Sequence, residues 1–182
     1  MAEFRRKRNR LGARAYQGRA AYFLTICTEG RRKLLGDSKL VDGLLGVLRE
    51  KCAVCFFDVY AYCFMPDHLH LILMGQREAA DLAAVVKAFK GAGTAVARQK
   101  GVRNLWEKSF YDHVLRSGEG IDEAARYVFM NPVRAGLARR MEDWPYSGSL
   151  VFEWRSWQVP VGEFVPTWKS GERMERQEQE RE

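Results

Sequence analysis

Two apolar segments separated by three turn residues most constrain the fold of this chain. Residues 54–64 (VCFFDVYAYCF) are rich in aromatic side chains, and residues 68–74 (HLHLILM) form a short apolar run, which are patterns typical of buried strands. Met65, Pro66 and Asp67 lie between them as a turn sequence, so we expect the two strands to pair as a hairpin. Because residues 54–64 are apolar on both faces, this strand is predicted to lie inside its sheet.

The second strand of this hairpin carries two of the three histidines in the protein. His68 and His70 are separated by one leucine, and side chains alternate between the faces of a strand, so both imidazoles are expected on one face. Leu69, Leu71 and Leu73 then point the other way, into a core. Two imidazoles a few ångströms apart are a candidate site for a divalent metal ion.

The segments around the hairpin predict a ferredoxin-like α+β fold. They are a strand over residues 20–28, a helix from a Ser38 cap to about residue 53, a helix over about 79–98, a strand within 105–117, and a helix from 121 or 122 to about 130. Their order is that of the ferredoxin-like fold, which RNA-recognition modules share. We therefore expect an antiparallel four-stranded sheet with two helices on one face, and an extra helix bearing Tyr127 on the open face.

The first nineteen residues carry most of the net charge. The chain has 182 residues and a formal net charge of +7, and residues 1–19 hold seven basic residues against the single acid Glu3. Such an arm is expected to bind a polyanion, the alternative being a solvated tail. The candidate DNA-binding residues of the arm are Arg5, Arg6, Lys7, Arg8, Arg10 and Arg14. A domain over 20–150 and a C-terminal extension over 151–182 follow, and the charged end of the extension is expected to be disordered.

The sequence shows no pattern for export or for membrane insertion. No apolar run is long enough to cross a membrane, and the charged N-terminus is not followed by the core of a signal peptide. The four cysteines (Cys27, Cys52, Cys55 and Cys63) are therefore expected to be reduced thiols in the cytoplasm. Cys52 and Cys55 form a lone C-x-x-C, for which ordinary half-buried cysteines are favoured over a zinc site.

The helix predicted near residues 121–130 adds a nucleophile and a further metal ligand. Tyr127 and Asn131 are four residues apart, so they share one face if the helix continues that far. A tyrosine hydroxyl has an ordinary pKa of about 10 and is a weak nucleophile at neutral pH. A divalent ion polarises a phosphate and stabilises the leaving oxygen. Together with the histidines, these residues predict cleavage of a phosphodiester through a phosphotyrosine intermediate.

Three other tyrosines are rival nucleophiles. Tyr60 and Tyr62 lie on the strand before the turn, where packing or base stacking is the more typical role. Tyr111 lies in the segment SFYDH, but strand alternation places Asp112 opposite Tyr111 and His113, so these three residues are not expected to form one cluster.

Further residues are candidate contacts to nucleic acid. Trp106, with Lys108 nearby, is a candidate for stacking on a base, the alternative being packing at the rim of the fold. Arg134, which follows Tyr127, is a candidate phosphate contact.

Taken together, these motifs closely resemble those of the single-tyrosine HUH transposases. H-hydrophobe-H on a strand is followed by Y-V-x-x-N-P-V-R-A-G-L on a helix, with the segments MPDHLHLIL, SFYDHVLRS and DWPYSGSL, and the resemblance spans about residues 16–149. Within the family the pattern is similar to that of the bacterial REP-associated tyrosine transposases.

This resemblance implies a metal-dependent enzyme that cuts and rejoins single-stranded hairpin DNA. By position, it implies that His68 and His70 bind Mg²⁺ or Mn²⁺, that Asn131 completes the metal site, and that Tyr127 forms a 5′-phosphotyrosine link and leaves a 3′-hydroxyl. The implied substrate is an imperfect palindrome with a short guide sequence at its foot. Members of this branch are often monomers, whereas the insertion-sequence enzymes are dimers that exchange the tyrosine helix. The alternative is a protein that binds hairpin DNA or RNA without turnover.

Overall fold

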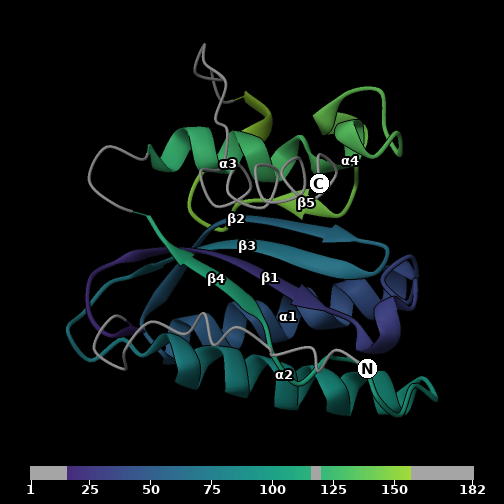
Figure 1. Ribbon diagram of the computed structural model, residues 1–182, viewed down its shortest axis with the longest axis horizontal. Coiled ribbons are helices and arrows are strands. Elements are labelled where there is room, and N and C mark those ends of the chain that lie inside the picture. The colour runs from purple at the N-terminus through teal and green to yellow at the C-terminus, as the bar shows by residue number, and fades with distance from the viewer. Residues whose placement is uncertain (1–15, 116–119, 157–182) are drawn as a thin grey trace, which may run out of the picture.

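The chain folds into three layers, with a β-sheet between two layers of helices (Figure 1). The computed structural model describes residues 16–115 and 120–156, so the basic arm residues Arg5 to Arg14 lie outside the described residues. The main elements are β1 (Ala21–Cys27), α1 (Ser38–Val54), β2 (Phe57–Met65), β3 (His68–Gly75), α2 (Leu82–Gln99), β4 (Tyr111–Val114), α3 (Ile121–Phe129), α4 (Asn131–Arg134) and β5 (Ser147–Gly148). Short 3₁₀ turns are η2 (Glu29–Arg31), η3 (Met141–Asp143) and η4 (Trp154–Ser156). No helix within these ranges is long and apolar enough to cross a membrane.

The sheet has the strand order β4-β1-β3-β2-β5, and every neighbouring pair is antiparallel. The first four strands confirm the predicted ferredoxin-like arrangement, with α1 and α2 on one face and α3 on the other (Figure 1). β5 adds a fifth strand to the predicted four-stranded sheet, near the segment from Asp143 to Ser147 that is expected to pack a final turn or strand onto the domain. It pairs with β2 at Tyr62 and Cys63, so β2 lies inside the sheet, as its apolar faces predict.

The ends of α1 differ from the sequence expectation at both termini. Asp37, not Ser38, is the N-cap, and its carboxylate accepts hydrogen bonds from the first free backbone N–H groups of the helix. At the other end the helix runs through Val54, and Phe56 adopts a left-handed φ of 61° that turns the chain into β2. The strand therefore begins at Phe57.

The sheet divides the hydrophobic core into two clusters of buried residues. Leu69, Leu71 and Leu73 belong to the cluster under α1 and α2, whereas Ile72 belongs to the cluster under α3. This division confirms the alternation predicted for the histidine strand. It also places His68 and His70 on the face that α3 partly covers.

Two glycines let α1 and α2 approach each other closely. A Cβ added to Gly43 would lie 2.8 Å from Cγ1 of Val96, and one added to Gly93 would lie 2.9 Å from Cδ2 of Leu44 and 3.2 Å from Nε1 of Trp106. α2 is continuous from Leu82 to Gln99, so its glycines mark a close approach of side chains rather than a break.

We expect alanine at Gly91 and at Gly93 to change stability in opposite directions. No atom lies within 4 Å of a Cβ added to Gly91, so helix propensity should raise the free energy of unfolding by about 0.5–1 kcal/mol. Gly93→Ala must push apart the buried side chains of Leu44 and Trp106, and it should lower the free energy of unfolding by about 1 kcal/mol. Urea unfolding followed by circular dichroism measures both variants, and equal effects would contradict the close approach at Gly93.

Candidate active site

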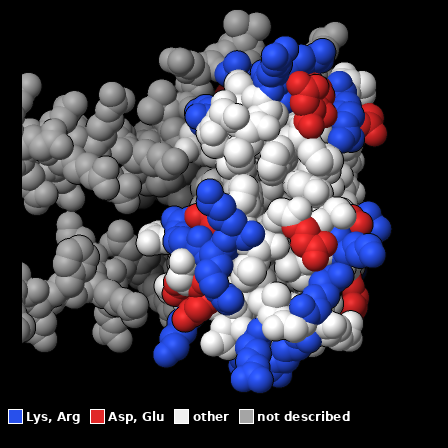
Figure 2. Space-filling model, turned by 90° about the vertical axis from the view of Figure 1, so that its right-hand side faces the viewer, with Lys and Arg blue, Asp and Glu red and all other residues white. Residues whose placement is uncertain are grey.

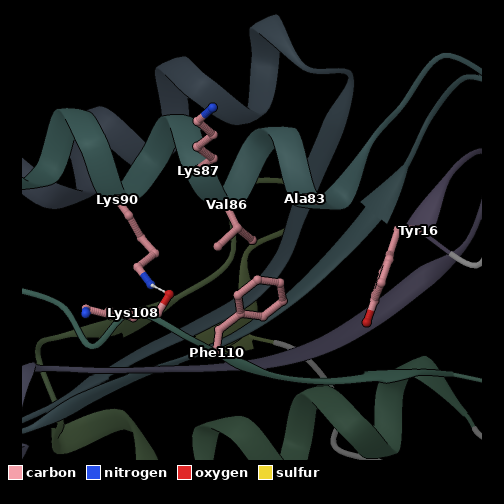
Figure 3. Close-up of a pocket in the computed structure, with 7 residues that line it drawn as sticks. All are labelled: Tyr16, Ala83, Val86, Lys87, Lys90, Lys108 and Phe110. Carbon is pink, nitrogen blue, oxygen red and sulfur yellow. Dashed lines mark hydrogen bonds between the residues drawn. The ribbon is translucent and has the colours of Figure 1, made fainter. Parts of the chain in front are cut away.

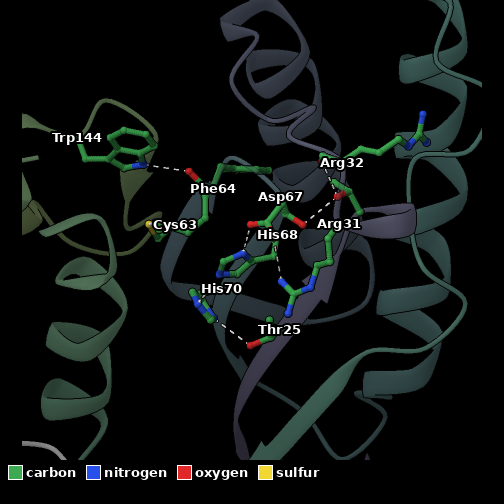
Figure 4. A network of polar contacts seen from close by, with 11 residues as sticks. Thr25, Arg31, Arg32, Cys63, Phe64, Asp67, His68, His70 and Trp144 are labelled. Atoms are coloured by element: carbon green, nitrogen blue, oxygen red, sulfur yellow. Dashed lines mark hydrogen bonds and ion pairs between the residues drawn. The ribbon is translucent and has the colours of Figure 1, made fainter. Parts of the chain in front are cut away.

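The two histidines of β3 face each other across a short gap. Their ring centroids are 4.6 Å apart and their Nε2 atoms are 3.0 Å apart (Figure 4). His70 is buried, and the side chain of His68 is 18% exposed, so solvent and ligands reach the pair from the His68 side.

The second nitrogen of each imidazole contacts a neighbouring oxygen. Nδ1 of His68 lies 2.6 Å from Oδ1 of Asp67, and Nδ1 of His70 lies 2.9 Å from Oγ1 of Thr25 on β1 (Figure 4). A carboxylate only accepts hydrogen bonds, so the Asp67 contact places the proton of neutral His68 on Nδ1 and makes its Nε2 an acceptor. The Thr25 hydroxyl can donate to Nδ1 of His70, and Nε2 of His70 then donates to Nε2 of His68 at 3.0 Å. A metal ion bound by both Nε2 atoms would take the place of the shared proton.

This donor set fits a divalent metal ion. The two imidazole Nε2 atoms are 3.0 Å apart, which is close enough for both to bind the same ion. Among the described residues no third His, Cys, Asp or Glu joins the pair to make a metal-binding cluster. A bound ion would therefore keep most of its coordination positions for water and other oxygen ligands.

Tyr127 lies on α3 over the same face of the sheet. Its ring packs edge-on against Phe23 of β1 at 5.8 Å, and Phe23 in turn lies 5.6 Å from the ring of His70. The start of α3 is held by Tyr60 of β2, whose hydroxyl donates to Asp122 at 2.5 Å. Tyr127 is only 8% exposed and belongs to the buried cluster under α3. The structure therefore brings the predicted nucleophile and the histidine pair to the same face of the sheet, with Phe23 in contact with both rings.

Asn131 and Arg134 secure the junction between α3 and α4. Pro132 has no N–H for the carbonyl of Val128, and Nδ2 of Asn131 donates to that oxygen at 3.1 Å and to the carbonyl of Tyr127 at 3.0 Å. Oδ1 of Asn131 accepts from Arg134 at 2.9 Å. The structure thus gives Asn131 a role in shaping the junction, while its predicted role as third metal ligand stays a prediction.

Arg134 contacts Tyr127 directly and is more than a surface cation. Its guanidinium carbon lies 3.9 Å from the centre of the Tyr127 ring, and Nη2 donates to the Tyr127 backbone carbonyl at 2.8 Å. Partial burial lowers the pKa of Arg134, although contacts with Tyr127 oppose the shift. The residue predicted to contact phosphate therefore also contacts the predicted nucleophile.

Two of the three rival tyrosines are poorly suited to attack. Burial and the hydrogen bond with Asp122 raise the pKa of Tyr60 to about 12. Burial also raises the pKa of Tyr62, whose ring lies in the cluster on the α1 and α2 side. Tyr111 is 69% exposed, and Asp112 instead accepts a hydrogen bond from Tyr16 at 2.9 Å.

The position of Trp106 shows that one of its two predicted roles, stacking on a base, is wrong. Only 8% of it is exposed, and its ring packs 5.6 Å from that of Phe89 on the side of the sheet away from the histidines. It is a core residue rather than a base-stacking one, because its neighbours on α2 cover it. Lys108, by contrast, is exposed.

Basic side chains gather at the end of the molecule where the histidine strand begins. β1 and α2 both finish at this end, which is at the right of Figure 1. Figure 2 looks onto the same end and shows more Lys and Arg side chains there than acidic ones. Exposed basic residues that follow β1 and α2 are Arg31, Arg32, Lys33, Lys100 and Arg103. Such a surface favours a polyanionic ligand beside the histidine pair.

Comparisons with known proteins agree with this arrangement. Residues 17–128 match the family described as "Transposase IS200 like". The chain is 25% identical over 137 residues to the REP-associated tyrosine transposase of Escherichia coli, covering 74% of this chain and 79% of that protein. It is 35% identical over 96 residues to the ISDra2 transposase TnpA of Deinococcus radiodurans, covering 51% of this chain and 67% of that protein.

A solved structure of a REP-associated tyrosine transposase bound to a REP hairpin has the same fold. It superposes with a TM-score of 0.64 at 22% sequence identity, covering 91% of this chain and 96% of that chain.

Proposed function

Because the chain belongs to the IS200-like transposase family, we propose that it cleaves and rejoins single-stranded hairpin DNA through a tyrosine-linked intermediate. The observation that carries this proposal is the placement of Tyr127 and of two histidines with converging Nε2 atoms on one face of the sheet. The relative from Escherichia coli and the hairpin-bound solved structure support a REP-type hairpin as the substrate.

The proposed chemistry is a phosphoryl transfer from a DNA oxygen to the tyrosine oxygen. Tyr127 loses its hydroxyl proton, the bond from its oxygen to phosphorus forms, and the bond from phosphorus to the 3′ oxygen breaks. The 3′ oxygen takes up a proton and leaves as a hydroxyl, and the 5′ phosphate stays on the protein. The exchange conserves one phosphate ester, so a 3′-hydroxyl can later reverse it and rejoin the strand.

His68 and His70 are the residues that would hold a divalent ion at this site. When bound, Mg²⁺ or Mn²⁺ would polarise the scissile phosphate and stabilise the leaving oxygen. Asp67 and Thr25 orient the two imidazoles toward the ligand from behind.

The test of this function is formation of a covalent adduct. The full chain is incubated with Mn²⁺ and a panel of single-stranded hairpins, taken from inverted repeats beside its own gene and labelled at the 3′ end. We expect a labelled species at the mass of protein plus DNA on a denaturing gel. Hairpin binding without an adduct on every member of the panel would support the alternative, a binding protein without turnover.

We expect Arg134→Ala to slow adduct formation about 10- to 100-fold while changing the dissociation constant for the hairpin less than about twofold. The guanidinium stacks on the Tyr127 ring and bonds to its carbonyl, so its loss should disorder the nucleophile more than it weakens DNA binding. Single-turnover rates and fluorescence anisotropy measure the two quantities separately.

Two further variants separate this role from that of a phosphate contact. Arg134→Lys should still form the adduct slowly, because an ammonium group has neither the paired N–H donors nor the planar stacking face of a guanidinium. Arg139→Ala removes an exposed arginine beyond α4 and should leave the rate unchanged. A loss of affinity without a change in rate at Arg134 would assign it to phosphate binding.

A further inference from the structure

A pocket lies against α2, on the opposite side of the sheet from the histidines. Its volume is about 360 Å³, which is within the range of small-ligand sites. Its walls are the rings of Tyr16 and Phe110 and the aliphatic side chains of Ala83 and Val86, and its rim carries lysines (Figure 3). An apolar slot with aromatic walls and a cationic rim suits a flat aromatic group attached to an anion.

The pocket is held open by hydrogen bonds of its own lining residues. Nζ of Lys90 donates to the backbone carbonyls of Glu107, Lys108 and Ser109 at 2.5, 3.1 and 3.2 Å, which fixes the segment leading into Phe110 (Figure 3). The hydroxyl of Tyr16 donates to Asp112 at 2.9 Å, which fixes the opposite wall. The walls are thus set before any ligand arrives, which reduces the entropy lost on binding.

Two lysines of the pocket are available to a ligand. Lys87 and Lys108 are exposed, and no hydrogen bond or ion pair with another described residue engages their ammonium groups. Lys90, in contrast, is engaged with the backbone carbonyls of the pocket wall. The positive rim therefore comes from α2 and from the segment before β4, one lysine on each side of the slot.

The edge strand β4 lies between the pocket and the candidate active site. Thr25 of β1 pairs with Tyr111 of β4 on one side and with His70 of β3 on the other, so the three residues form one row across the sheet. Because neighbouring strands are about 4.8 Å apart, Tyr111 lies about 10 Å from His70. Tyr111 is exposed, whereas its neighbour Phe110 packs toward the α1 and α2 side. A single strand leaving the histidine pair past Tyr111 and over the edge strand β4 would reach Phe110 next.

We propose that this pocket binds an unpaired nucleotide of the single-stranded DNA that flanks the hairpin. The base lies against Phe110 and Tyr16 over Val86, and Lys87 and Lys108 bind the adjoining phosphates. Aromatic stacking and lysine contacts of this kind bind single strands with little dependence on sequence. The inference rests on the proposed function, since it takes single-stranded DNA as the substrate.

The test measures binding of the full chain to fluorescein-labelled oligothymidylate of about fifteen nucleotides, in EDTA so that no cleavage occurs. Phe110→Leu keeps an apolar side chain in the pocket wall but removes the aromatic face, and we expect affinity to fall about five- to tenfold. Phe110→Trp keeps an aromatic face and should bind at least as well as the wild type. A circular dichroism melt of each variant verifies that it is folded.

Matched charge reversals test the lysine rim. Lys87→Glu and Arg49→Glu change the net charge equally, but Arg49 is an exposed residue of α1 whose charge acts on Tyr62 of β2, which is separated from the β4 edge by two strands. We expect the first to weaken binding about tenfold and the second less than about twofold. Equal effects would mean that Lys87 attracts DNA only through its charge, as any exposed basic residue does. That result would overturn the inference.

An oligonucleotide of the same length made of abasic sites separates base stacking from phosphate attraction. We expect Phe110→Leu to leave its affinity unchanged, and an equal loss for both oligonucleotides would overturn stacking in the pocket. If the wild type forms the covalent adduct while Phe110→Leu and Lys87→Glu bind normally, the pocket inference fails and the proposed function stands. If these variants lose binding but no hairpin gives an adduct, the pocket is retained and the proposed enzyme activity fails.

Discussion

Replacing Tyr127 with phenylalanine should reduce the covalent protein–DNA adduct by at least about 1,000-fold, because the substitution removes the oxygen that is proposed to form the bond to phosphorus. The ring itself remains, so its contact with Phe23 at 5.8 Å and the stacked guanidinium of Arg134 are kept. We therefore expect the folded state and the affinity for hairpin DNA to be unchanged. The measurement is the yield of 3′-labelled adduct on a denaturing gel with Mn²⁺ present.

Tyr111→Phe is the matched control for this substitution. Tyr111 is the exposed rival, at 69% exposure, and it lies in the same row of the sheet as His70. Its phenylalanine variant should form the adduct at a rate close to that of the wild type. If the adduct persists in Tyr127→Phe and is lost in Tyr111→Phe, the nucleophile is Tyr111 of β4 and not Tyr127.

Local patterns were sufficient to predict the parts of the fold that depend on alternation and helical periodicity. His68 and Leu69 lie on opposite faces of β3 because consecutive side chains must, and this single rule assigned both the core side and the site side of the sheet. The turn at Pro66 and the run of apolar residues on either side predicted the hairpin for similar local reasons.

Features that depend on how strands pair across the sheet could not be read in this way. Thr25 supports His70 only because β1 pairs with β3 in a register that sets these residues opposite each other. Trp106 looks available for stacking in the sequence, yet α2 covers it because Gly93 leaves room for its indole. Each depends on residues far apart in the chain, and periodicity carries no information about register or helix approach.

The motif around Tyr127 shows how a resemblance can identify residues without explaining them. The sequence gives no direct sign that Asn131 replaces the hydrogen bond that Pro132 cannot make, or that Arg134 stacks on the tyrosine. Both follow from the end of α3 at Phe129 and the immediate start of α4. The four residues NPVR thus form a compact support for Tyr127, which explains why proline is tolerated so close to the end of α3.

Removing His70 should have an effect as large as removing the nucleophile. We expect His70→Ala to lower the rate of adduct formation in Mn²⁺ by at least about 1,000-fold, because one of two protein nitrogens that converge within 3.0 Å is lost. Mn²⁺ binding should be lost as well, and titration calorimetry or the electron paramagnetic resonance signal of free Mn²⁺ measures it without reference to activity. His113→Ala removes the third histidine, on β4, and should leave Mn²⁺ affinity unchanged.

The carboxylate behind His68 should have a graded effect on the same measurement. Asp67→Asn replaces an acceptor 2.6 Å from Nδ1 with a neutral amide, so His68 becomes a weaker ligand and Mn²⁺ affinity should fall about 10- to 100-fold. Asp67 also pairs with Arg31 at 3.4 Å, and Arg31→Ala keeps the carboxylate on His68 while removing that partner. Its Mn²⁺ affinity should stay within about twofold of the wild type, since exposed ion pairs contribute little. Unchanged affinity in both His70→Ala and Asp67→Asn would place the metal elsewhere in the protein.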